Sequence, residues 1–476
     1  MKHPSLSTMT NSYFWVIPSF FLCSLFAFSA GSGALIGMAA LIGFVFFILM
    51  LFSGIRVIAT ILIIGVPTAF VFPNQAIQAL PFVNTERLLF VCMIGLLTLN
   101  LWMTQKPRQP WVRTEKYAFG FLCIAIASYC YAVFTGEYVS DLKKDIFYII
   151  QYVMGFSGFI IATRIDWNKQ DIIRLADILL FVGVFMAGQA VVQYFLGSDI
   201  FVPSYLEVPH ATEGRATGTF ANSSEYGAVA ATILILGIYR YSVTNGAFIK
   251  TLIIGILGVI CIAIFLSKTR APWLAVAMSL MLITYFDRKV RPMLVFCGTI
   301  GVIAAIIVLP FFIDINTIQE RFSSLAPIYN RLSLWVSGIS MGLQNPVLGV
   351  GFGADGFKTA HPFYTIDIAG ISAYWAKGVG IPHNEFIHIL ALSGFTGLYL
   401  FLATFVTAFK QLKAIALNAM INEQAKLLAV YGNIILFNFL INALFVDTGS
   451  FWYLLFLVMF IMGCAISYAN HRHQAS

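Results

Sequence analysis

Long runs of apolar residues dominate this chain and are separated by short polar breaks. A bilayer-crossing helix needs about 20 predominantly apolar residues, and about fourteen windows approach that length. Residues 34–52, 175–196 and 292–313 are clear examples, whereas residues 57–72 and 273–286 form shorter windows. The pattern predicts an all-α polytopic membrane protein with about 12–14 transmembrane helices.

Composition supports a membrane protein rather than a soluble one. Hydrophobic residues make up 60% of the 476 residues, and charged residues only 10%. Average soluble domains carry about 25% charged residues. The first window, residues 13–30, lacks a strongly basic leader and is followed at once by another apolar run, so we expect a retained helix. The seven cysteines all lie within apolar runs without metal-ligand spacing and are expected to be packing residues.

Lysine and arginine collect in alternate breaks between the apolar windows. Short loops rich in these residues face the cytoplasm, so both termini are expected there. The net charge of +8 is then largely a topological signal, and no basic, aromatic-interleaved surface indicates nucleic-acid binding. The residues in these breaks are Arg56, Lys106, Arg108, Arg113, Lys116, Arg164, Lys169, Arg174, Arg240, Lys250, Arg288, Lys289, Arg291, Lys410, Lys413 and Lys426.

The opposite face is predicted to carry residues 197–222, a very short turn at 268–272, and a long loop at 314–383 before the last three helices. Loops of that length are often functional. We expect three regions in the chain: N-terminal transmembrane helices at 1–196, a catalytic region at 197–408 and C-terminal transmembrane helices at 409–476.

A few polar and basic residues lie on this sparsely charged face. Arg215, Lys268 with Arg270, Arg331 and His383 come from four separate segments that project to the same side. A single arginine there is most simply a snorkelling side chain or a rim ion pair. Several together favour an anionic ligand, because guanidinium groups match phosphate oxygens bidentately. An isoprenoid diphosphate fits this arrangement.

Asn222, Ser223 and Ser224 are the expected N-cap residues of a helix that follows Arg215. Backbone N–H groups at a helix start favour an anion, although the same pattern is also a routine helix entry. Further along, the apolar residues of 332–343 recur at helical spacing, which predicts a helix lying along the membrane surface.

Other familiar motifs are absent or misplaced. Gly351, Gly353 and Gly356 spell G-x-G-x-x-G, but no βαβ unit surrounds them, so we interpret them as a tight loop turn. We find no D-x-D, H-E-x-x-H, carboxylate cluster or G-x-S-x-G motif, and therefore expect no metal and no other cofactor. His383 and His388 are five residues apart and are expected to point in different directions on a helix.

Four motifs in a fixed order resemble one known family. "HNEFIHILALSGFTG" places His383 and Asn384 ahead of Gly394-Phe-Thr-Gly397, and "RLSLWVSGISMGLQNPVLGVGFGADGF" has Arg331, a tryptophan and then P-x-x-G-x-G. "GRATGTFANSSEYGA" and "SKTRAPWLA" precede them. Over residues 214–398 the chain resembles the O-antigen ligase and O-antigen polymerase superfamily of bacterial inner-membrane glycosyltransferases. It departs in having serine where many members have proline in "FANSSEYGA", and the N-terminal helices are not covered.

The resemblance implies a GT-C-type fold and metal-independent, inverting transfer of a glycan carried on undecaprenyl diphosphate, on the periplasmic face of the inner membrane. It implies that Arg215, Arg270 and Arg331 bind the diphosphate, and we add Lys268 from its position. It also implies that His383 is essential. Preorganised guanidinium groups can stabilise the leaving diphosphate, so Arg331 is also a catalytic candidate.

His383 can accept the proton of the acceptor hydroxyl, since imidazole titrates near neutrality and a helix start favours its neutral form. A purely orienting role for His383 stays open. For His388 we favour packing or acceptor contact. Asn384, His361, Tyr374 and Trp375 are candidate acceptor or glycan contacts. For His361 a surface residue without a role is the commoner interpretation, and the two aromatics are equally well membrane anchors.

Several functions remain compatible with the sequence. The predicted product is a cell-surface polysaccharide such as O-antigen, capsule or exopolysaccharide. A repeat-unit polymerase, which uses a lipid-linked glycan as acceptor and can work with a chain-length regulator, is slightly favoured by the extra N-terminal helices and the long loop. The alternatives are an O-antigen ligase acting on lipid A-core, a protein O-oligosaccharyltransferase, a lipid-linked glycan transporter, and a catalytically silent scaffold. Transporters place charges near the bilayer midplane, which is not the pattern here.

Overall fold

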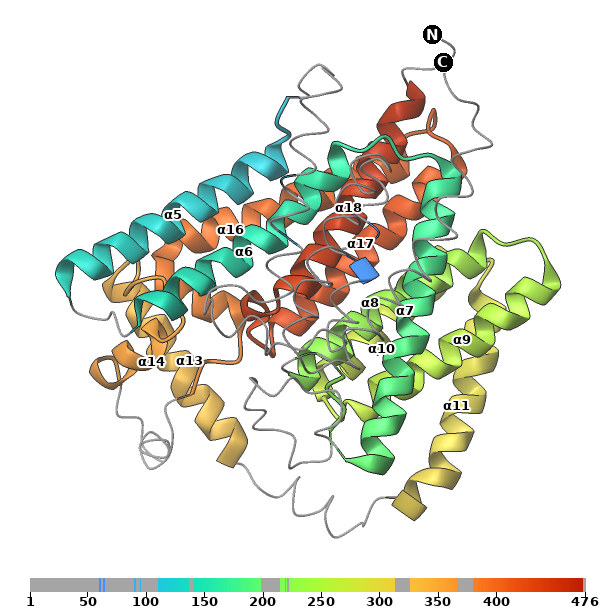
Figure 1. Ribbon diagram of the computed structural model, residues 1–476, viewed down its shortest axis with the longest axis horizontal. Helices are drawn as coiled ribbons and strands as arrows, with labels where there is room; N and C mark the ends of the chain where they lie inside the picture. Colours follow the sequence, from blue (N-terminus) through green and yellow to red (C-terminus); the bar gives the residue numbers. More distant parts are fainter. Residues whose placement is uncertain are drawn as a thin grey trace, which may run out of the picture. The chain divides into compact units, whose positions relative to one another are not determined.

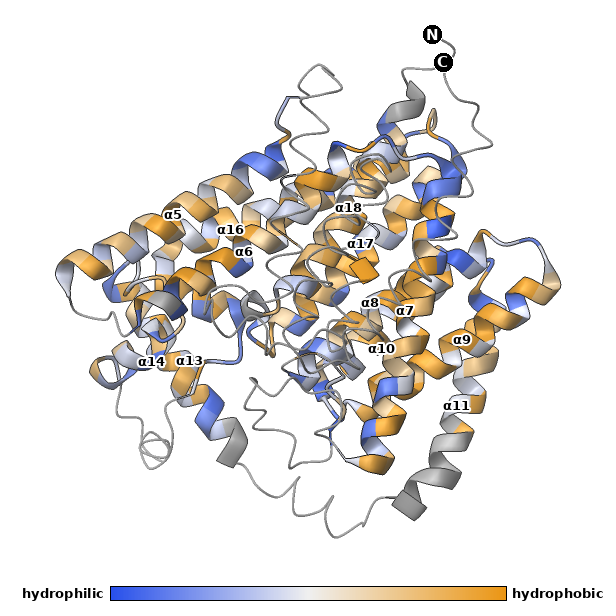
Figure 2. Ribbon diagram, viewed as in Figure 1, coloured by the Kyte–Doolittle hydropathy of each residue, from blue (hydrophilic) through white to orange (hydrophobic). Residues whose placement is uncertain are grey.

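The protein is all-helical over the residues that its computed structural model describes. These are residues 60, 63–64, 90, 95, 110–136, 141–197, 215–218, 220, 222–312, 326–365 and 380–473. Within them are 12 α-helices, two short 3₁₀ helices and no strand (Figure 1). Seven of these helices are long and apolar enough to cross a membrane, and their apolar colouring is visible in Figure 2. The all-α membrane fold is confirmed, while the windows before residue 110 lie almost wholly outside the described residues.

The described residues form two compact units. The first contains α7 (Lys169–Leu196), α8 (Ser223–Ser242) as far as Ile233, and α9 (Ala247–Leu266) from Gly255 onward, ending at Thr269. Asn222 accepts a hydrogen bond from the Ser224 N–H at 2.7 Å, so the expected cap of α8 is present.

The second unit is larger and carries most of the candidate residues. Its core is α18, whose membrane-length stretch is completely buried among its neighbours, and which packs against α6, α16 and α17. A helix that is apolar on all sides belongs at the centre of a bundle. The elements of this unit are α5 (Arg113–Thr135), α6 (Leu142–Thr163), α10 (Arg270–Phe286), α11 (Arg291–Phe312), α13 (Ala326–Gln344), α14 (Gly356–Ala360), η4 (His361–Phe363), α16 (Glu385–Leu417), α17 (Glu423–Ala443), η5 (Thr448–Ser450) and α18 (Trp452–His473).

A backbone break interrupts α16 at Gly394, where φ is 67°. The turn after α13 fills the break: the Val350 N–H donates to the Ala391 carbonyl at 2.9 Å, and the Phe395 N–H donates to the Pro346 carbonyl at 2.8 Å. Irregular backbone at membrane depth is tolerated only where such partners satisfy it. The glycine-rich turn that follows α13 and the Gly394-Phe-Thr-Gly397 motif of α16 therefore pack directly against each other.

The tight-turn interpretation of the G-x-G-x-x-G stretch is confirmed. A side chain at Gly353 would collide with the Asp145 carboxylate, which accepts a hydrogen bond from the Ala354 N–H at 2.8 Å. The turn is thereby tied to the start of α6. The helix predicted around residues 332–343 is also confirmed as α13, and its orientation to the membrane stays a prediction.

Replacing Gly349 by alanine is expected to destabilise the protein by about 1–3 kcal/mol. The residue has a φ of 67°, and a Cβ there would meet the backbone of Leu392 and Ser393. Thermal unfolding of the detergent-solubilised protein measures the effect. Gly298→Ala in α11 is the control, because a Cβ there meets no atom within 4 Å. Equal melting temperatures for the two variants would contradict the packing described.

Candidate functional site

The centre of the candidate site is the Asp447 carboxylate, in the turn between α17 and α18. Its side chain is only 3% exposed. One oxygen, Oδ2, accepts a hydrogen bond from the His383 backbone N–H at 3.0 Å and lies 3.6 Å from His383 Nδ1. The other oxygen, Oδ1, lies 3.4 Å from His388 Nδ1. One buried carboxylate thus joins the two histidines.

His383 lies before α16 rather than on it, and this corrects the expectation that the two histidines point in different directions. Asn384 is the N-cap, and its side chain accepts from the Phe386 and Ile387 N–H groups at 3.1 and 3.2 Å. His383 itself has a φ of 51°, a conformation that non-glycine residues rarely adopt. Its side chain is 45% exposed. The rare backbone conformation allows the ring and the N–H of His383 to face Asp447 together.

The segment before His383 is held by α13. Trp335 Nε1 donates to the Pro382 carbonyl at 2.8 Å. Arg331 lies four residues before Trp335, so the two side chains share a face of α13. That face is directed toward the start of α16, which places Arg331 beside the His383 segment.

Arg270 and Arg331 interact electrostatically with each other. Partial burial and the positive charge of Arg270 lower the pKa of Arg331 from its ordinary value, and the charge of Asp447 opposes that shift. Two nearby guanidinium groups destabilise each other, and an anion held between them removes that cost. The predicted association of these two arginines is therefore supported within this unit.

Arg215 and Lys268 belong to the other unit. The Ala216 N–H next to Arg215 donates to the Leu266 carbonyl at 3.0 Å, and Lys268 Nζ lies 5.8 Å from the centre of the Tyr194 ring. The Arg215 loop and the Lys268 turn are therefore adjacent. Their meeting with Arg270 and Arg331 stays a prediction.

Four further residues are candidate contacts for the acceptor or the glycan. His361 is only 3% exposed, so the surface interpretation is wrong. Its ring lies 6.1 Å from the Phe357 ring, and burial lowers its pKa from the ordinary value. Asn384 is buried as the helix cap, and its contact with a glycan stays a prediction. Tyr374 and Trp375 lie outside the described residues.

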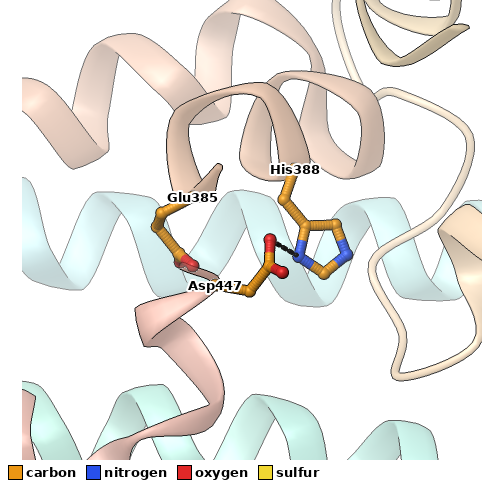
Figure 3. A group of neighbouring side chains, drawn as sticks. All are labelled: Glu385, His388 and Asp447. Atoms are coloured by element: carbon orange, nitrogen blue, oxygen red, sulfur yellow. Dashed lines mark ion pairs between the residues drawn. The ribbon is translucent and has the colours of Figure 1, made fainter. Parts of the chain in front are cut away.

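Among the described residues, the group closest to a metal site is Glu385, His388 and Asp447, whose ligand atoms lie within 4.8 Å of one another (Figure 3). Glu385 already accepts hydrogen bonds at both oxygens, from the Tyr152 hydroxyl at 2.5 Å and from the Gly449 N–H at 2.8 Å. Each oxygen keeps a second lone pair, and carboxylates that bind metals are commonly hydrogen-bonded, so this donor set is compatible with a hydrogen-bond network and with a metal site alike.

Sequence reasoning missed Asp447 and gave Glu385 no role. Both residues are separated by more than 60 positions from one of their partners, so no local spacing links them. A usable signal was present: Asp447 is the only acidic residue in the break between the last two apolar windows, on the face that carries His383.

Residues 255–402 match the family model described as O-Antigen ligase (Wzy_C). The match begins in α9 and ends in α16, so that it includes Arg270, Arg331 and His383 but neither Arg215 nor Asp447. No curated protein matches the sequence. The multi-pass helical protein therefore carries an O-antigen ligase domain at residues 255–402, of a family whose members are glycosyltransferase-like ligases and polymerases of lipid-linked glycans.

Proposed function

We propose that the protein transfers a glycan from undecaprenyl diphosphate to an acceptor hydroxyl, at the periplasmic face of the bacterial inner membrane. The observation that carries the proposal is the partly exposed His383 held against buried Asp447, beside Arg331. The domain match supports the reaction class. The distribution of lysine and arginine supports cytoplasmic termini and a periplasmic site.

His383 acts as the general base. Its Nε2, the ring nitrogen that does not face Asp447, takes the proton as the acceptor O–H bond breaks. The acceptor oxygen forms a bond to the anomeric carbon, and the bond from that carbon to the diphosphate breaks with its electron pair on the leaving group. Asp447 stabilises the imidazolium that forms. Attack opposite the leaving group inverts the anomeric centre.

The arginines act on the leaving group. Negative charge grows on the diphosphate as the glycosidic bond breaks, and Arg270 and Arg331 are placed to stabilise it. We propose that Arg215 and Lys268 complete this diphosphate site. Because cations of the protein supply this stabilisation, we propose transfer without a metal ion or other cofactor.

Arg331→Ala is expected to lower kcat by about 10²–10³-fold, the usual loss when one preorganised donor to a developing charge is removed. The assay uses purified protein in liposomes with an undecaprenyl-diphosphate-linked oligosaccharide and an acceptor. Arg288→Ala, in the exposed turn between α10 and α11, is the matched arginine control and is expected to be fully active. Equal activity of both variants would remove Arg331 from the mechanism.

The same assay identifies the acceptor. We propose repeat-unit polymerisation, supported by the large number of predicted N-terminal helices and the long loop at 314–383. A ladder of products on the lipid carrier is then expected. A single product on lipid A-core would identify a ligase, and a glycosylated protein an oligosaccharyltransferase. Movement of the intact lipid-linked glycan across the liposome, without bond cleavage, would identify a transporter.

A further inference from the structure

A buried network of hydrogen bonds continues behind Asp447. His388 Nδ1 lies 3.4 Å from Asp447 Oδ1 and 3.3 Å from the Tyr148 hydroxyl. The Tyr148 and Tyr152 hydroxyls are 3.2 Å apart, and Tyr152 reaches Glu385. All five side chains are buried. They come from α6, α16 and the turn after α17, so the network joins the elements around the site.

The positions of the protons follow from the partners. With its carboxylate ionised, Glu385 accepts at both oxygens, one of them from the Tyr152 hydroxyl. A tyrosine hydroxyl donates only one hydrogen bond, so Tyr152 must accept from Tyr148. Tyr148 has then used its own proton and can only accept from His388. His388 must therefore carry a proton on Nδ1 and donate it to Tyr148, and the same N–H faces Asp447 Oδ1.

We propose that His388 is a positioning residue: its Nδ1–H, 3.3 Å from the Tyr148 hydroxyl, faces Asp447 Oδ1 at 3.4 Å, and this contact keeps Oδ2 toward His383. This inference rests on the proposed function, because it gives His388 its purpose through His383. It also explains why a second histidine is buried beside the first. Asp447 also interacts electrostatically with Arg331 on α13, and Arg331 in turn with Arg270 on α10.

The tautomer can be measured without any activity assay. The protein contains seven histidines, so ¹⁵N-histidine labelling in nanodiscs gives few signals, and the His388→Asn spectrum identifies the one from His388. We expect His388 to be protonated at Nδ1 and not at Nε2. An Nε2–H tautomer in the wild-type protein would overturn the proposal, whatever the reaction is.

Two substitutions of His388 test its effect on transfer. An asparagine amide nitrogen can replace the Nδ1–H donor, whereas a glutamine amide nitrogen lies nearer the position of Nε2. A hydrogen bond to a charged group contributes enough to change a rate about 10–100-fold. We expect His388→Gln to lower kcat by that factor at unchanged KM, and His388→Asn to recover most of the loss. Equal losses in both variants would contradict a donor role.

The pH profile gives a readout that loss of packing does not produce. Without the Nδ1–H of His388, Asp447 keeps more of its negative charge for His383 and stabilises the imidazolium form. Only neutral His383 can accept a proton, so the rise of kcat with pH is expected to move to higher pH in His388→Gln. An unshifted profile would count against positioning. Arg331, which also interacts electrostatically with Asp447, and Arg270 are unchanged in this variant.

Tyr431→Phe is the matched control. Tyr431 is also buried and donates to a carboxylate, Asp287, at 3.0 Å. It lies in the first half of α17, 12 residues or about 18 Å before the helix ends at Ala443, and Asp447 lies beyond that end. We expect lower thermal stability but unchanged kcat.

If the wild type transfers no glycan, the proposed function fails. A different result would overturn only the positioning role of His388: wild-type protein transfers glycan, His383→Ala does not, and His388→Gln is fully active. If EDTA abolishes activity and Mn²⁺ restores it, Glu385, His388 and Asp447 bind a cation, and the positioning role of His388 is wrong.

Discussion

Replacing His383 by alanine is expected to lower kcat for glycan transfer by about 10²–10⁴-fold, the usual contribution of a positioned general base. The acceptor hydroxyl would keep its proton until its bond to the anomeric carbon is far advanced. Donor affinity is expected to change little, because the arginines bind the diphosphate. Single-turnover transfer and equilibrium binding of the lipid-linked donor measure the two effects separately.

A second variant separates a base from an orienting group. His383→Gln keeps a polar group near the acceptor but has no basic nitrogen, so it is expected to be as inactive as His383→Ala. His473→Ala, at the carboxyl end of α18, is the control for removing a histidine and is expected to be fully active. If His383→Gln transfers glycan while His383→Ala does not, His383 orients the acceptor and a different group accepts the proton.

The helices were predictable where the cause is local. The window at 175–196 corresponds to α7, which begins earlier, at Lys169, because Asn168 and Asp171 form a capping box at its start. The window at 292–313 corresponds to α11 within one residue at each end. Apolar length and short-range capping decide both helices, and both causes can be read from the sequence.

The break in α16 was not predictable in the same way. Gly394 alone is compatible with a continuous helix, since single glycines are common in membrane helices. The break depends on the turn at residues 345–351, which supplies the hydrogen bonds that the interrupted helix loses. That turn lies more than 40 residues earlier in the chain. Contacts at such separation are decided by packing and not by local preference.

In the candidate site, too, features with a local cause were predictable and those that depend on distant contacts were not. His383 could be singled out because a histidine at the start of an apolar run is chemically unusual. The five-residue spacing predicts that His383 and His388 point in different directions on one helix, which is wrong because His383 precedes the N-cap with a positive φ. Asp447 and the two tyrosines of α6 become relevant only when three distant segments meet. Hydropathy treats them as ordinary interruptions.

Replacing Asp447 by asparagine is expected to lower kcat by roughly 10²–10⁴-fold with little change in donor binding. Both carboxylate oxygens face N–H donors: Oδ2 accepts from the His383 backbone, and Oδ1 faces Nδ1 of His388. An asparagine has one acceptor oxygen, so its amide N–H group must oppose one of these donors. The negative charge that stabilises the His383 imidazolium is lost as well. Kinetics of the reconstituted protein measure the effect.

Asp355→Asn is the matched control for the Asp447 variant. Asp355 is a partly exposed aspartate that pairs with Lys144 at 3.7 Å, and such surface pairs contribute about 0–1 kcal/mol to stability. We expect Asp355→Asn to keep full transfer activity. Asp447→Asn should still fold, since a neutral side chain of the same shape is easily buried, and its melting temperature checks this. A well-folded Asp447→Asn protein with wild-type kcat would show that His383 works without this carboxylate, and the proposed base mechanism would fail.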